Sequence, residues 1–239
     1  MRLQLAMPVI SLFALSICLL PIAGVVWIAH KWSGRGQETA VASLRMLVQL
    51  LAVGFVLVFL FASPNPLVGL AVVAVMVLAS AAIGVRTVVA NRRAAFMKAI
   101  AAIGIAGSAV LAFVLFAVLT LHDPWYQPRF IIPLAGMIFS NAMTAITLAA
   151  ERLAREEAAG VDYNNARGVA WNAALIPQIN ALLAVGIVSL PGMMTGQILS
   201  GVDPLTAVRY QIVVMAMILQ SAAFAVAIFL WLSKPEAAT

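Results

Sequence analysis

Charge is scarce in this sequence. Of its 239 residues, 9% are charged and 64% are hydrophobic, and the mean hydropathy is +1.09. A water-soluble domain carries about 25% charged residues, so too little charge is present here to cover a soluble globule. The single cysteine, Cys18, excludes an intramolecular disulfide and a cysteine-based metal cluster. The Walker and dinucleotide-binding glycine patterns are absent, so any ATP that drives this protein is bound by another chain.

Long apolar runs, by contrast, fill most of the chain. A helix of about 20 residues crosses the roughly 30 Å hydrocarbon core of a bilayer, and the runs have about that length. We therefore predict an all-α, polytopic membrane protein with a single transmembrane domain over residues 1–239. The first run is too long for a cleavable signal peptide and no A-x-A site follows it, so we interpret it as a retained helix. The seven predicted spans cover residues 4–29, 43–62, 67–85, 99–121, 130–150, 170–190 and 205–232.

Lys and Arg residues are distributed unequally between the loops that join these spans. Of the 14 basic residues, Arg2, Arg129 and Arg209 fall on one side of the seven-span arrangement and the others on the opposite side. Because basic loops are retained in the cytoplasm, we predict an N-terminus outside and a C-terminus inside. The net charge of +6 thus indicates orientation in a membrane and not binding to nucleic acid.

Polar residues inside the spans are the most informative feature, because polar groups in hydrocarbon are costly without partners. In the fifth span, small and hydroxylated residues recur at intervals of three and four and form one stripe that includes Ser140 and Thr144, with Asn141 beside it. Such a stripe either permits close helix packing with interhelical hydrogen bonds or lines a substrate path. In the sixth span, Pro177 is flanked by Asn172, Gln178 and Asn180, and we leave open whether these amides make buried structural contacts or line a polar cavity.

A break is predicted after the sixth span. Ser189 can cap a helix and Pro191 can occupy its first turn, so a short helix is expected here, with Gly192 and Gly196 forming a close-packing face. Asp203 and Pro204 have the same pattern, which predicts the start of the last span. The prediction places irregular backbone at one membrane face, where protein or water must cover it.

Acid–base and metal-binding side chains are few. No predicted span carries Asp, Glu or His within the hydrocarbon, so a membrane-bound enzyme lacks support. We interpret His30 and His122 as interfacial residues. Methionines such as Met193 and Met194 can bind soft metals, although their ordinary role is packing, and the metal ligands stay unknown.

Several motifs in the second half closely resemble the FetB-type permease family. They are I-P-L-A-G-M-I at 132–138, N-A-M at 141–143, A-A-L-I-P at 173–177, S-L-P-G-M-M-T-G at 189–196, and Asp203–Pro204 with Y-Q-I at 210–212. The resemblance implies the membrane subunit of an ABC transporter that exports iron from bacteria, related to plant aluminium-tolerance permeases. It further implies a separate cytoplasmic ATP-binding subunit, a homodimer in the lipid of the bacterial inner membrane, and no cofactor. The residues that we expect along the substrate path are Ser140, Asn141, Thr144, Gln178, Asn180, Met193, Met194 and Gln211.

The chain departs from that family between the fifth and sixth spans, where its cytoplasmic segment is shorter. Pairs at i and i+4 predict that the fifth helix continues into the cytoplasm. The short segment keeps a second function open, namely a channel or secondary carrier that works without an ATPase. The expected ATPase-facing residues are Glu151, Arg152, Arg155, Glu157 and Arg167.

Overall fold

A computed structural model describes residues 10–62, 65–88, 91–120 and 126–235. The described chain is helical apart from its turns and one isolated bridge between Val185 and Ser189, as the all-α prediction requires. Two compact units are present, Met1–Ser63 and Pro64–Thr239. Each is treated by itself below, and the single transmembrane domain stays a prediction.

The first unit is a pair of helices, α1 (Leu12–Ser33) and α2 (Gly36–Ala62), which contact each other. The Ser11 hydroxyl accepts the Ala14 N–H at 3.2 Å and caps the start of α1. Gly34 adopts the left-handed conformation that ends α1, with φ of 68°. The predicted first span therefore lies several residues too early, and its first part falls outside the described residues.

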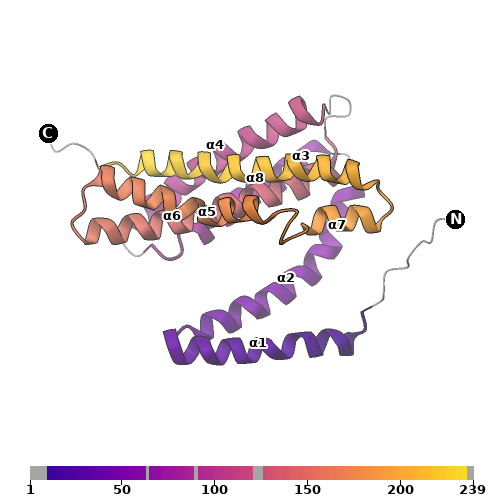
Figure 1. Cartoon of the computed structure of the whole chain (residues 1–239), viewed down its shortest axis with the longest axis horizontal. Coiled ribbons are helices and arrows are strands. Elements are labelled where there is room, and N and C mark those ends of the chain that lie inside the picture. The colour runs from indigo at the N-terminus through magenta and orange to yellow at the C-terminus, as the bar shows by residue number, and fades with distance from the viewer. Residues whose placement is uncertain (1–9, 63–64, 89–90, 121–125, 236–239) are drawn as a thin grey trace. The chain divides into compact units, whose positions relative to one another are not determined.

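The second unit is a helical bundle (Figure 1). Its central helix is α5, which packs against α3, α4, α6 and α8. The largest fully buried side chains include three from α5, namely Ile138, Phe139 and Ile146, because this helix has neighbours on several sides. A short helix, α7, follows α6 and contacts the long α8. The elements are α3 (Pro66–Gly84), α4 (Arg92–Phe113), a π-helical segment η1 (Val114–Val118), α5 (Pro128–Ala158), α6 (Tyr163–Ala184), α7 (Gly192–Leu199) and α8 (Pro204–Leu232).

Local sequence signals account for several helix starts. Asp203 accepts the Thr206 N–H at 3.0 Å and Pro204 is the first residue of α8, so both parts of that prediction are confirmed. Asp162 caps α6 in the same way, through the backbone N–H groups of Asn164 and Asn165. The cap at Asp162 places the start of α6 seven residues before the predicted span.

Six described helices are long and apolar enough to cross a membrane: α1, α2, α3, α4 with η1, α5 and α8. Helix α6 is not among them, because polar residues such as Asn164, Asn165, Arg167 and Asn172 interrupt its apolar sequence. It also ends at Ala184, whereas the predicted span runs to residue 190. The structure thus confirms a multi-span helical membrane protein, and the seventh span stays a prediction.

Candidate functional site

A small cavity lies in the second unit, where the ends of several helices meet. Its volume is about 40 Å³. A buried water needs about 10–15 Å³, so the cavity has room for an ion or a few waters. Residues from η1 and the following turn, α5, α7 and α8 form its walls: Val114, Leu119, Arg129, Phe130, Pro133, Leu134, Met137, Met193, Tyr210, Val213 and Val214.

Two interruptions of regular helical hydrogen bonding border this cavity. At the end of η1 the Leu119 N–H donates to the Val114 carbonyl at 2.9 Å, which is the wide spacing of a π-helix. Pro133 lies inside α5 and has no N–H to give to the Arg129 carbonyl one turn earlier. π-helical turns occur frequently at functional sites. Irregular backbone at both walls makes this the strongest candidate site in the described chain.

The cavity is apolar with a few distinct polar atoms. Met137 of α5 and Met193 of α7 are the methionines of its wall, and Tyr210 and Arg129 are the wall residues with polar side-chain groups. Thioethers are soft ligands, whereas hard cations prefer carboxylate and carbonyl oxygens. Among the described residues, no group of three or more His, Cys, Asp or Glu could hold a metal ion. The described residues of this wall thus include no carboxylate of the kind that hard cations prefer.

Two glutamines are buried in the bundle. Gln178 of α6 and Gln211 of α8 are 4% and 5% exposed, and neither Oε1 atom has a hydrogen-bond partner. A buried polar atom without a partner is costly, so such an atom indicates a function or an unseen partner. Gln211 lies on the same face of α8 as Val214, which lines the cavity. Neither glutamine belongs to the cavity wall, so their place on a substrate path stays a prediction.

The hydroxyl stripe of α5 has a different environment. Ser140 and Thr144 are exposed, and Asn141 is half-buried. Their side chains donate to carbonyls of their own helix, at 3.3 Å for Ser140 to Met137 and 3.0 Å for Thr144 to Ser140. The predicted interhelical hydrogen bonds of these groups are therefore not made within the described chain, because carbonyls one turn away already accept their protons. Ser221 of α8 instead reaches α5, through the Ile138 carbonyl at 3.4 Å.

The remaining candidates for the substrate path lie in different environments. Met194 is buried but does not line the cavity, and Asn180 is exposed on α6. Of the eight candidates, only Met193 lies in the cavity wall. Sequence reasoning missed Arg129 and Tyr210 as wall residues, although Pro133 was a signal of irregular backbone nearby.

The break after α6 confirms the predicted short helix but corrects its details. Helix α7 spans Gly192–Leu199, and Pro191 is its N-cap, so Ser189 is not the cap. The Ser189 carbonyl instead accepts the Gly186 N–H at 2.9 Å and closes the preceding turn. No atom of the described residues lies within 4 Å of a Cβ built at Gly192 or Gly196, so these residues do not make the expected close packing.

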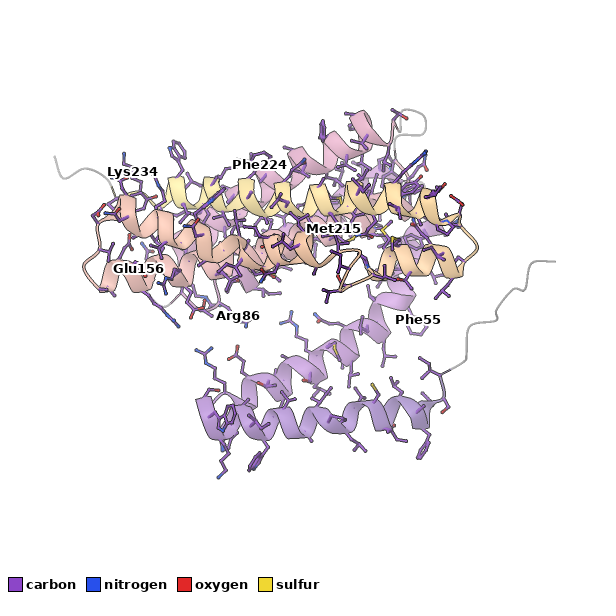
Figure 2. All side chains as sticks on the ribbon, viewed as in Figure 1. Phe55, Arg86, Glu156, Met215, Phe224 and Lys234 are labelled. Carbon is purple, nitrogen blue, oxygen red and sulfur yellow. The ribbon has the colours of Figure 1, made fainter. Side chains whose placement is uncertain are left out.

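The opposite end of this unit carries most of its charge. Helix α5 continues to Ala158 as predicted, with ion pairs of 2.5 Å between Arg155 and Glu151 and 2.7 Å between Arg152 and Glu156. Figure 2 shows Glu156 and Lys234 at this same end. Only four residues separate α5 from α6, so no separate helix fits between them. The expected ATPase-facing residues Glu151, Arg152, Arg155, Glu157 and Arg167 all lie on this helical hairpin.

Hydrogen bonds also order the hairpin. The Asn165 backbone N–H, together with its side-chain amide and the Asn164 N–H, holds the pKa of Asp162 below its usual value. The Tyr163 hydroxyl donates to the Leu230 carbonyl of α8, and burial raises the pKa of this tyrosine. The start of α6 is thus fixed beside the end of α8.

Several apolar helices around a small, carboxylate-free cavity define the class of this protein, a multi-span helical membrane protein. The family described as "Uncharacterised protein family (UPF0014)" matches residues 10–162 and 160–237. The chain belongs to the UPF0014 family. The two matched pieces meet at residues 160–162, in the turn between α5 and α6.

Curated relatives cover most of the chain. The UPF0014 membrane protein slr1647 of Synechocystis is 34% identical over 219 residues, which are 84% of this chain and 84% of that protein. YjkA of Bacillus subtilis, also named a UPF0014 membrane protein, is 29% identical over 85% of this chain and 86% of its own length. A protein of Escherichia coli named "Probable iron export permease protein FetB" is 29% identical over 92% of this chain and 89% of its own length. No solved structure matches the chain.

Proposed function

We propose that this chain is the membrane subunit of an ABC-type exporter that moves metal ions, iron first among them, out of the cytoplasm. The observation that carries the proposal is the similarity, along 92% of the chain, to the relative named "Probable iron export permease protein FetB". The cavity beside η1 and Pro133 supports it, since it offers a small solute a place among irregular backbone and thioethers. The metal is the substrate of the transport cycle and not a resident cofactor.

Seven spans, with the N-terminus outside, form part of this proposal. The first residue of α6, Tyr163, lies beside the C-terminal end of α8, because its hydroxyl donates to the Leu230 carbonyl. After α6, the chain returns through α7 to the first residue of α8. If α8 crosses the bilayer, the chain between Tyr163 and Pro204 must travel the same depth in the opposite direction. This reasoning supports α6 as the seventh span, despite its polar residues.

The basic end of the second unit is the proposed cytoplasmic face. In the seven-span arrangement this end carries most of the unit's basic residues, and the other end carries Arg129 and Arg209. The basic residues of the proposed cytoplasmic end are Arg86, Arg92, Arg93, Lys98, Arg152, Arg155, Arg167 and Lys234. The α5–α6 hairpin would meet a separate ATP-binding subunit there. Two copies of the chain would form the complete permease in the bacterial inner membrane.

A second function is favoured by one observation. The connection between α5 and α6 is a turn of four residues, which leaves no element there to insert into an ATPase. A channel or secondary carrier that needs no ATPase is therefore the alternative. Its transport would continue in membranes that lack any ATP-binding partner.

Metal transport into inside-out vesicles tests both functions. Vesicles carrying this chain alone, or together with the ATP-binding protein that co-purifies with it, are supplied with iron and with other metals in parallel. We expect iron uptake that requires both the partner and ATP. Uptake by the chain alone supports the alternative, and absence of uptake for every metal tested contradicts the proposal.

A matched methionine pair tests the cavity. Met193→Leu removes a sulfur from the cavity wall at nearly constant volume, whereas Met194→Leu makes the same change at a buried position outside it. If the substrate passes the Met193 thioether, only the first variant lowers the transport rate. If both variants have the same transport rate, Met193 has a packing role and does not contact the substrate.

A further inference from the structure

A groove of about 340 Å³ lies between the first turns of α6 and the last turns of α8. Its volume is within the usual range of ligand pockets, roughly 300–1,000 Å³. One cation, two indoles and small or apolar side chains form it: Arg167, Gly168, Trp171, Ala227, Leu230 and Trp231. No carboxylate stands among the described residues that line this groove, so Arg167 makes this lining positive.

Arg167 supplies that charge, and among the described residues it forms no ion pair with a carboxylate. In the part of the chain that the structure describes, the ion pairs of the hairpin are formed by Arg152 and Arg155 with Glu156 and Glu151. The Arg167 guanidinium instead lies 5.9 Å from the centre of the Tyr163 ring, a contact that orients it and leaves its N–H groups for an anion. Charge complementarity therefore predicts an anionic ligand.

The other walls suit the boundary of a membrane. Trp231 is 71% exposed near the end of α8, and Trp171 is half-buried on α6. Tryptophan is enriched where hydrocarbon meets the polar headgroups. Nothing lies within 4 Å of a Cβ built at Gly168, so the floor of the groove is open to an acyl chain.

We propose that this groove binds one anionic phospholipid. Its phosphate accepts hydrogen bonds from the Arg167 guanidinium, and one acyl chain lies along Gly168 and Ala227 between the two indoles. The groove lies along the sides of two helices, one of them a membrane-span candidate, where a lipid arrives from the bilayer.

Native mass spectrometry of the purified full-length chain tests the site. Detergent-solubilised protein is titrated with phosphatidylglycerol or phosphatidylcholine, with no ATPase present, so the result is independent of the proposed docking. We expect preferential retention of phosphatidylglycerol, at least tenfold weaker in Arg167→Gln. Lys234→Gln removes one charge at the same end but outside the groove and should change retention little.

A steric pair examines the floor of the groove. Gly168→Leu should weaken phosphatidylglycerol binding because its side chain fills open space, whereas Gly168→Ala should have a small effect. Brominated phosphatidylglycerol should quench Trp171 and Trp231 in a background where Trp27, Trp32 and Trp125 are replaced by Phe. This quenching places the lipid in the groove itself.

Four results would overturn the proposal. If Arg167→Gln retains phosphatidylglycerol as well as the wild type does, Arg167 does not bind the phosphate. If Lys234→Gln loses as much phosphatidylglycerol as Arg167→Gln, the lipid is attracted to the basic end in general. Competition by millimolar inorganic phosphate would identify a phosphate site instead. Dissociation of a dimer by Gly168→Leu, with lipid retention unchanged, would show that a second copy of the chain covers this groove.

Discussion

The Tyr163 hydroxyl at the start of α6 donates a hydrogen bond to the Leu230 carbonyl near the end of α8. These residues are 67 positions apart, so the bond fixes the distance between two helices that no short loop connects. The Leu230 carbonyl, one of the last in α8, also accepts the Ser233 backbone N–H at 3.0 Å, and Tyr163 is its second donor. The contact thus couples the charged hairpin to the last helix of the bundle.

Tyr163→Phe removes this hydrogen bond while keeping the ring. We expect a loss of about 0.5–1.5 kcal/mol in the free energy of unfolding, typical of one hydrogen bond. Denaturant unfolding in detergent, followed by tryptophan fluorescence, measures it. Asn164→Ala, at the exposed next position, is the control and should unfold like the wild type. A Tyr163→Phe protein as stable as wild type would show that water replaces the tyrosine.

Close packing between α4 and α5 provides a second prediction. A Cβ at Gly107 would collide with the ring of Phe139, which is 1% exposed and cannot move into solvent. We expect Gly107→Ala to lower stability by about 1–3 kcal/mol, as overpacked cores do. Gly104→Ala is the matched control on the same helix, because its Cβ would lie 3.7 Å from a Val77 methyl, an ordinary contact. Comparable melting temperatures for the two variants would contradict this packing.

Local signals in the sequence predicted some boundaries well and others poorly. Asp203 and Pro204 indicated the start of α8 because a cap and a first-turn proline act within a few residues. The end of α6 was misplaced because residues 185–190 are mostly apolar, whereas the helix already stops before Gly186, whose φ is 81°. Hydropathy measures partition into lipid and does not detect a turn closed by backbone hydrogen bonds.

The candidate site was only partly predictable for a related reason. Gln178 stood out in the sequence because amides are costly inside a span, whereas Gln211 was selected through the Y-Q-I motif of the family resemblance, and both are buried. The cavity itself depends on tertiary packing, since its walls come from η1, α5, α7 and α8. The stripe around Ser140 followed helical periodicity, but periodicity does not reveal which face of α5 its neighbours leave open.

The cap at Asp162 gives a pH prediction. Because hydrogen bonds lower its pKa in the folded state, the carboxylate stabilises the hairpin above its unfolded pKa of about 4, and this contribution is lost as the pH falls through the lower folded value. Asp162→Asn keeps a good capping residue and removes the titration. The difference in melting temperature between wild type and variant should be constant from neutral pH to about pH 5 and then shrink. A difference independent of pH would contradict the assignment.

The open surroundings of α7 predict tolerance at Gly192. Since no atom of the described chain lies within 4 Å of a Cβ at this position, Gly192→Leu should leave the stability of the single chain unchanged. Gly69→Leu is the contrasting variant, because even its Cβ would collide with the buried ring of Tyr126. Membrane levels and melting temperature of both variants test this. Misfolding of Gly192→Leu would show that α7 packs more closely than the structure indicates.

Membrane topology is decided most directly at the two ends of α6. Reporter fusions at Arg92 and Gly160 should lie in the cytoplasm, because basic residues surround both positions. A fusion at Asp203 should lie outside if α6 crosses the bilayer, since it precedes α8 at the end opposite to the hairpin. A cytoplasmic reporter at Asp203 would leave only the six apolar helices as spans. An external reporter at Arg92 would reverse the orientation, and the α5–α6 hairpin could then no longer face an ATPase.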